Sequence, residues 1–157
     1  MKNLGPLILA ILATLLFASV YGSPNGAPPK ACSDLKPGHE EGKYETKLAN
    51  PCSLSAEEQS DGSYKIILSA SPPNYFRGFL LAVKSGSKYL GTWSAVKDAK
   101  NLACPKGDSI THKDKNKKTS VTFTWIPAPG DAGKAKKLEG ACVKDFETFW
   151  QLQHALN

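Results

Sequence analysis

The sequence lacks the local motifs that mark the common enzyme classes. It contains no G-x-S-x-G, no H-E-x-x-H, no C-x-x-C and no glycine-rich phosphate loop. Serine hydrolases, zinc proteases, thioredoxin-like oxidoreductases and nucleotide-binding enzymes each depend on one of these arrangements. The sequence also has no N-x-S/T acceptor for N-glycosylation. We therefore expect no catalytic centre and no intrinsic enzyme activity.

Histidine is scarce, which limits both metal binding and acid–base chemistry. His39, His112 and His154 lie far apart in the sequence, whereas a zinc site needs at least three converging ligands. We interpret His39 and His112 as hydrogen-bonding framework residues. The adjacent carboxylates Glu40–Glu41 and Glu57–Glu58 point apart on loops and do not make a glycosidase pair. The sequence thus predicts no bound metal and no cofactor.

Long apolar runs are absent except near the N-terminus. Lys2 is followed by an uncharged apolar stretch over residues 7–20, and small residues follow at the end of this stretch. This arrangement is typical of a secretory signal peptide, which we place at residues 1–22, with a single domain over 23–157. The run is shorter than the roughly 20 residues that a membrane span needs. We expect a secreted, extracellular protein with no membrane span.

Negative charge is in the minority, because 20 basic residues against 14 acidic ones give a net charge of +6. A basic secreted protein is attracted to anionic glycans, envelopes and phospholipids, although the charge could equally serve solubility alone. Nucleic acid is a poor partner, because no exposed aromatics alternate with the basic residues. The lysines gather in two turns, which would form one polybasic patch if they lay at the same end of the fold. These candidate anion-binding residues are Lys113, Lys115, Lys117 and Lys118 in one turn, and Lys134, Lys136 and Lys137 in the other.

Cysteine is sparse but even in number. Cys32, Cys52, Cys104 and Cys142 all lie outside the predicted signal peptide. In an oxidising compartment four cysteines imply two disulfides. Three connectivities are possible, and the spacing does not choose among them.

Extended segments separated by glycine, proline, serine and asparagine predict an antiparallel β-sandwich. The strict alternation over residues 121–126 puts Val121, Phe123 and Trp125 on one face. Trp93 and Trp150 fit either the core or a sugar-stacking surface. Residues 146–152 fit either a short terminal helix or a continuation of the last strand. We expect five residues to be largely buried, namely Ile67, Phe79, Leu81, Phe123 and Trp125.

An ordered set of motifs covers nearly all of residues 23–157. It comprises Cys32 with Pro37 and His39, the segment Phe76-Arg77-Gly78-Phe79-Leu80-Leu81, Gly91, Cys104, Thr111-His112, the segment from Lys118 through Val121-Thr122-Phe123-Thr124-Trp125-Ile126-Pro127-Ala128-Pro129, and Phe149-Trp150. In content and order this set resembles the reeler domain of reelin, F-spondin and small secreted invertebrate defence proteins.

The resemblance implies an immunoglobulin-like sandwich with a Cys32–Cys104 disulfide, which leaves Cys52 and Cys142 for a second bridge. Because no further module follows before Asn157, the chain resembles the stand-alone secreted type. That type is associated with innate immunity and with binding of microbial surface components or anionic glycans. The alternative is an extracellular matrix or adhesion protein built on the same sandwich. We expect a monomer.

Overall fold

The computed structural model describes residues 23–37, 47–94, 96–131, 134 and 136–156. The predicted signal peptide, His39 and the Glu40–Glu41 pair lie outside the described residues. No helix within the described part of the chain is long and apolar enough to cross a membrane.

Over the residues that it describes, the structure is all-β apart from one short 3-10 helix, η1 (Pro29–Ser33). The strands are β1 (Cys52–Glu58), β2 (Tyr64–Ala70), β3 (Gly78–Ser85), β4 (Lys88–Tyr89), β5 (Thr92–Ser94), β6 (Ala99–Cys104), β7 (Gly107–His112), β8 (Ser120–Ile126), β9 (Lys136–Val143) and β10 (Phe149–Leu156).

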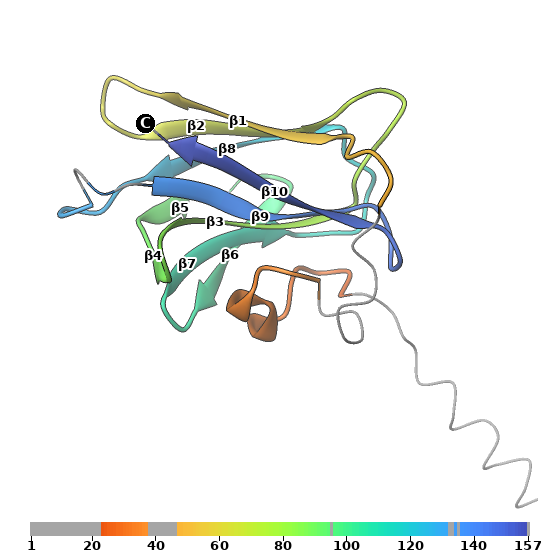
Figure 1. Cartoon of the computed structure of the whole chain (residues 1–157), viewed down its shortest axis with the longest axis horizontal. Helices are drawn as coiled ribbons and strands as arrows, with labels where there is room; N and C mark the ends of the chain where they lie inside the picture. The colour runs from red at the N-terminus through yellow and green to blue at the C-terminus, as the bar shows by residue number, and fades with distance from the viewer. Residues whose placement is uncertain (1–22, 38–46, 95, 132–133, 135, 157) are drawn as a thin grey trace, which may run out of the picture.

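The strands form two antiparallel sheets that pack face to face. One sheet has the order β1-β2-β8-β5, and the other has the order β10-β9-β3-β7-β6, with β4 paired to β3. In Figure 1 the four-stranded sheet lies above the six-stranded one, and the N-terminal segment with η1 lies below both. The predicted antiparallel sandwich is confirmed.

Alternation in β2 and β8 places the core between the sheets. Phe123 and Trp125 are fully buried, as predicted, and so is Ile66, which pairs with Phe123. The expectation that Ile67 is largely buried is wrong. Ile67 pairs with Thr122 and is only half-buried, because successive side chains of a strand point to opposite faces. The sequence alone left the phase of this strand ambiguous by one residue.

Strand β3 is buried on both faces, which explains its unbroken apolar sequence. Phe79 and Leu81 face the core between the sheets. Leu80 and Ala82 face the other way, into a second cluster that contains Leu35 and other residues of the N-terminal segment. The N-terminal segment is therefore a partial third layer on the outer face of the six-stranded sheet (Figure 1).

The C-terminal end of the chain is a strand rather than a helix. Trp150 lies in β10 and is 6% exposed, and Trp93 in β5 is 3% exposed. Both tryptophans are thus core residues, and neither offers a ring for stacking on a sugar.

Two disulfides join the layers. Cys32–Cys104 ties the N-terminal segment to β6, and Cys52–Cys142 ties β1 of one sheet to β9 of the other. The described part of the chain has no free cysteine. These are the pairings that the resemblance, and the two cysteines it leaves over, predict.

Candidate anion-binding site

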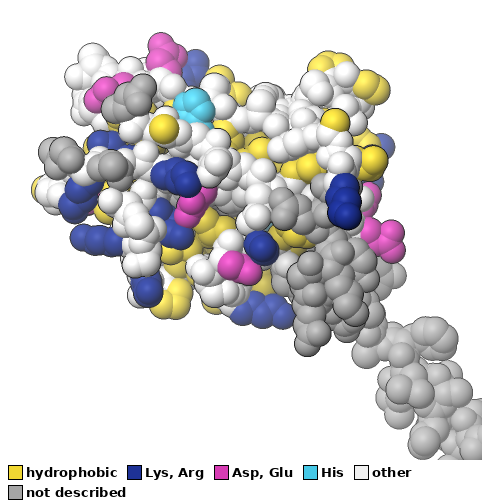
Figure 2. Space-filling model, in the orientation of Figure 1, with side chains coloured by type: hydrophobic (Ala, Val, Ile, Leu, Met, Phe, Trp, Pro, Cys, Tyr) yellow, Lys and Arg dark blue, Asp and Glu magenta, His cyan; other side chains and the backbone are white. Residues whose placement is uncertain are grey.

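The two lysine clusters lie at opposite ends of the sandwich. The loop that follows β7 precedes Ser120, whereas the loop that follows β8 begins after Ile126, so the length of β8 separates them. They therefore do not form the single patch that a shared end would give. On the face shown in Figure 2, basic side chains are spread over much of the surface and interspersed with acidic ones.

Of the second cluster, Lys134 is neutralised by a buried carboxylate, whereas Lys136 is half-buried and Lys137 is exposed. The Lys134 ammonium lies 3.0 Å from the carboxylate of buried Asp131, which offsets its charge. Burial on its own raises the pKa of Asp131, but hydrogen bonds from Lys134 and from the backbone amides of Ala128 and Gly91 outweigh it and lower that pKa. This end of the sandwich is built around a neutralised pair.

The loop between β7 and β8 exposes three of its four lysines. Lys113, Lys115 and Lys117 are exposed, whereas Lys118 is 7% exposed. The Lys118 ammonium donates to the Asp114 carboxylate at 2.8 Å. It also donates to the carbonyl oxygens of Asn116 at 3.0 Å and Asp114 at 3.1 Å, and more weakly to that of Arg77 at 3.4 Å. Lys118 is a structural residue that shapes the loop, so it is not available to a ligand.

Two basic residues that the sequence interpretation missed join this loop in space. Arg77 stands at the entry to β3, and Lys144 follows β9. Their charged groups lie 5.5 and 5.8 Å from the centroid of the Tyr75 ring, and the Lys117 ammonium lies 4.4 Å from it. We call Tyr75, Arg77, Lys117 and Lys144 the tyrosine cluster. It brings cations from three separate connections around one aromatic ring, an arrangement that favours cation–π attraction.

Backbone contacts fix the positions of these connections. The Arg77 guanidinium donates to the carbonyl of Lys115 at 3.0 Å, and its backbone amide donates to the carbonyl of Val143 at 2.8 Å. Phe76 and Lys118 form an isolated antiparallel bridge between two of the connections. No local sequence pattern reveals this convergence, because it depends on which strand ends meet.

A groove of about 1190 Å³ adjoins the tyrosine cluster. One wall is the N-terminal segment, and the other is the outer face of β3 and β9, including Leu80, Ala141 and Val143. Arg77 and Lys144 line the groove and also belong to the tyrosine cluster.

Contacts with β7 hold the N-terminal wall in place. Thr111 Oγ1 accepts a hydrogen bond from the Ala27 amide at 2.9 Å and donates to the Phe79 carbonyl at 2.8 Å. Next to it, His112 Nδ1 accepts from the Phe79 amide at 3.2 Å, and Nε2 donates to the Ser23 carbonyl at 3.1 Å. Burial lowers the pKa of His112, which keeps the neutral ring in this role. His112 is thus a framework residue.

Glycine is required where the N-terminal wall approaches β7. Gly26 has a φ of +109°, and a Cβ there would lie 2.7 Å from the Lys100 side chain and 2.9 Å from the His112 carbonyl oxygen. A larger residue would push the segment off the sheet.

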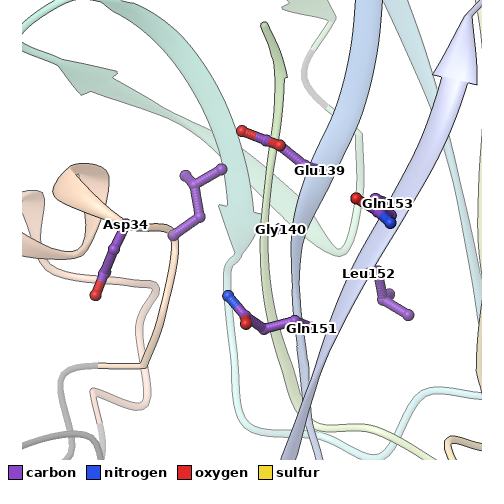
Figure 3. A pocket seen from close by; sticks show the side chains of 7 residues that line it. Asp34, Glu139, Gly140, Gln151, Leu152 and Gln153 are labelled. Atoms are coloured by element: carbon purple, nitrogen blue, oxygen red, sulfur yellow. The ribbon is translucent and has the colours of Figure 1, made fainter. Parts of the chain in front are cut away.

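A smaller polar pocket of about 330 Å³ lies further along the same face. Figure 3 shows Glu139, Gln151 and Gln153 directed toward it from β9 and β10, with Asp34 across from them. Glu139 is already paired with Lys84 at 2.8 Å. This pocket has no cationic side chain in its lining as described, so the anion-binding potential lies with the tyrosine cluster and the groove.

Among the described residues no group of three or more histidine, cysteine, aspartate or glutamate side chains comes together. His112 is held by its bonds to Phe79 and Ser23, and His154 lies half-buried on β10. Glu57 and Glu58 end strand β1 as exposed residues, so the expectation that they lie on a loop is wrong.

Comparison with known proteins gives consistent matches over most of the chain. The reeler domain family model matches residues 30–156. "Defense protein l(2)34Fc" of Drosophila melanogaster is 33% identical over 149 residues, with 90% of this chain and 91% of that protein covered. A protein of Antheraea mylitta, whose name also contains the words "defense protein", is 32% identical over 155 residues, with 91% and 88% covered.

Solved structures agree on the fold. The reeler domain of human F-spondin superposes with a TM-score of 0.58 at 23% identity, covering 74% of this chain and 94% of that one. With a family model that spans most of the described residues and a reeler-domain fold in the structure, the chain belongs to the reeler domain family.

Proposed function

We propose that this protein is an extracellular, defence-type binding protein that recognises anionic components of microbial surfaces through the tyrosine cluster. The observation that carries the proposal is the convergence of Arg77, Lys117 and Lys144 on the Tyr75 ring. The names of the relatives support the defence role. The two disulfides support an oxidising, extracellular location.

The tyrosine cluster suits an anion for electrostatic reasons. Three cations around one ring repel each other in the free protein, and a bound anion would relieve that repulsion. None of the three appears among the ion pairs found in the described residues, which involve Lys84, Lys118 and Lys134. No carboxylate of the described residues therefore neutralises these charges, and loops held on a rigid sandwich are common binding surfaces.

We also propose that the protein acts by binding alone. The tyrosine cluster offers ammonium, guanidinium and phenol groups, which bind anions. General acid–base catalysis needs a group that titrates near the working pH. The nearest candidate, His112, is held between Phe79 and Ser23.

Two matched triple variants test this proposal. Lys117→Gln and Lys144→Gln in the tyrosine cluster, with Lys115→Gln beside it in the same loop as Lys117, together remove three positive charges at this end. Lys88→Gln, Lys136→Gln and Lys137→Gln remove the same charge at the other end. Binding to immobilised lipoteichoic acid and lipopolysaccharide is measured at several salt concentrations. We expect the first variant to bind several-fold more weakly with a shallower salt dependence, and the second to bind nearly as the parent does.

Equal losses in both variants would mean that only net charge matters, and would overturn the assignment of the site. Tighter binding to hyaluronan or heparan sulfate than to either microbial polymer would favour a matrix or adhesion role instead.

A further inference from the structure

The groove beside the tyrosine cluster has a composition that anion binding alone does not explain. Its wall on the sheet side is apolar, formed by Leu80, Ala141 and Val143. The opposite wall includes Ala27 and Pro28 of the N-terminal segment. A site for a hydrophilic polyanion needs no such walls, because a charged polymer gains nothing from apolar surface.

The charges around this groove are strongly one-sided. Among the described residues that line it, one is acidic, Asp145, and five are basic: Lys30, Lys36, Arg77, Lys115 and Lys144. None of the five takes part in an ion pair found in the described residues. The groove therefore combines an apolar interior with unneutralised cations.

We propose that the groove binds a single-chain anionic amphiphile, with the acyl chain between the N-terminal segment and β3–β9 and a phosphate or carboxylate headgroup at Arg77 and Lys144. This inference rests on the proposed function, since it names the chemical part of an anionic surface molecule that this face recognises. The chain supplies hydrophobic contact and the headgroup supplies charge complementarity.

The size and anchoring of the groove fit this occupant. At about 1190 Å³ the groove is slightly larger than most ligand pockets, which enclose about 300–1,000 Å³ and are largely apolar with a few polar groups that fix orientation. The N-terminal wall is fixed by the Cys32–Cys104 disulfide and by a 2.6 Å hydrogen bond from Tyr89 to the Cys32 carbonyl. The groove is thus largely formed before a ligand arrives, which lowers the entropy lost on binding.

The test titrates the purified protein calorimetrically with dodecyl phosphate and decyl phosphate below their micellar concentrations. Inorganic phosphate serves as the headgroup alone, and dodecyltrimethylammonium carries the same chain with the opposite charge. We expect dodecyl phosphate to bind about 15-fold more tightly than decyl phosphate, since each buried CH₂ strengthens binding about fourfold. We expect dodecyltrimethylammonium to bind much more weakly than dodecyl phosphate.

A blocking variant locates the site. Val143→Trp fills the groove from the outer face of β9, and Ile67→Trp is its control, a matched change at a half-buried strand position on the other sheet. We expect Val143→Trp to weaken the binding of dodecyl phosphate at least tenfold, and Ile67→Trp to leave this binding unchanged. Circular dichroism establishes that both variants fold, and the smaller Val143→Phe replaces Val143→Trp if the latter does not.

The outcomes separate the two proposals. If chain length and Val143→Trp have no effect while lipoteichoic acid still responds to the tyrosine-cluster variant, the amphiphile inference is overturned and the proposed function stands. If dodecyl phosphate binds in the groove but the tyrosine-cluster variant binds the microbial polymers as the parent does, the proposed function fails while the groove remains an amphiphile site. If dodecyltrimethylammonium binds as tightly as dodecyl phosphate, the headgroup assignment is wrong.

Discussion

The Lys118 ammonium lies 2.8 Å from a carboxylate oxygen of Asp114, inside the loop that connects β7 to β8. The lysine side chain is 5% exposed and the aspartate side chain 39% exposed, so the pair is buried on one side only. The hydrogen bond from Lys118 is the main reason that the pKa of Asp114 is lowered. This pair, together with the carbonyls that Lys118 also contacts, sets the shape of the loop that carries Lys115 and Lys117.

Replacing Lys118 therefore tests how much these contacts stabilise the fold. We expect Lys118→Met to lower the free energy of unfolding by about 1–3 kcal/mol, because three carbonyls and a carboxylate lose a donor. Lys115→Met removes an exposed charge of the same loop and should cost less than about 0.5 kcal/mol. Urea denaturation of both variants measures the difference, and equal values would contradict the structural role of Lys118.

His112 should make stability depend on pH in a defined direction. Burial lowers its pKa in the folded protein from the ordinary value of 6.5. In the window between the folded value and 6.5, the unfolded state binds more protons than the folded state. The stability that neutral His112 contributes is therefore fully present above pH 6.5, and it is lost as the pH falls from 6.5 through the folded-state pKa.

The measurement is urea denaturation at pH 7.5, 6.5, 5.5 and 4.5 for the parent and for His112→Gln. We expect the parent to lose stability over this range more steeply than the variant, whose side chain does not titrate. A parent curve parallel to that of the variant would show that His112 does not titrate abnormally.

Some of this architecture could be predicted from the sequence and some could not. Alternation located Phe123 and Trp125 correctly, because in a strand with one buried face every second residue is apolar. It failed for Ile67, because Ile66, Ile67 and Leu68 are all apolar and only pairing with β8 decides which face each occupies. In an unbroken apolar run such as this one, the sequence does not show which residues face the core.

The binding surface shows a similar limit. The lysines after β7 lie close together in the sequence and are easily noticed. Whether they lie at the same end of the sandwich as Lys134 depends on the strand order, which the spacing of residues does not reveal. Arg77 and Lys144 meet at Tyr75 because the ends of β2, β7 and β9 lie together. The sequence also could not predict the burial of Lys118, since a lysine in a loop normally extends into solvent.

The phase of β2 can be tested directly. We expect Ile66→Ala to cost about 2–5 kcal/mol of unfolding free energy, because it leaves a cavity in the core. Ile67→Ala removes a half-buried side chain on the outer face and should cost roughly 1 kcal/mol. Guanidinium denaturation gives both values, and a larger cost at Ile67 would mean that the register of β2 with β8 is shifted by one residue.

The two disulfides should make different contributions to the fold. Cys32–Cys104 spans 72 positions of sequence and Cys52–Cys142 spans 90, and loops of that length stabilise by about 4–5 kcal/mol each in the chain-entropy model. The first joins a covering segment to a sheet edge, whereas the second joins the two sheets across the core. Loss of the second should therefore destabilise the whole sandwich.

We expect Cys32→Ser with Cys104→Ser to free the N-terminal segment while the sandwich stays folded. Trypsin should then cut after Lys30 much faster than in the parent, and dodecyl phosphate binding should fall because one wall of the groove is loose. Cys52→Ser with Cys142→Ser should instead lower the denaturation midpoint for the tryptophan fluorescence of the core, which reports on Trp93, Trp125 and Trp150. If trypsin cut both variants alike in the N-terminal segment, the first disulfide would not be what holds that wall against the sheet.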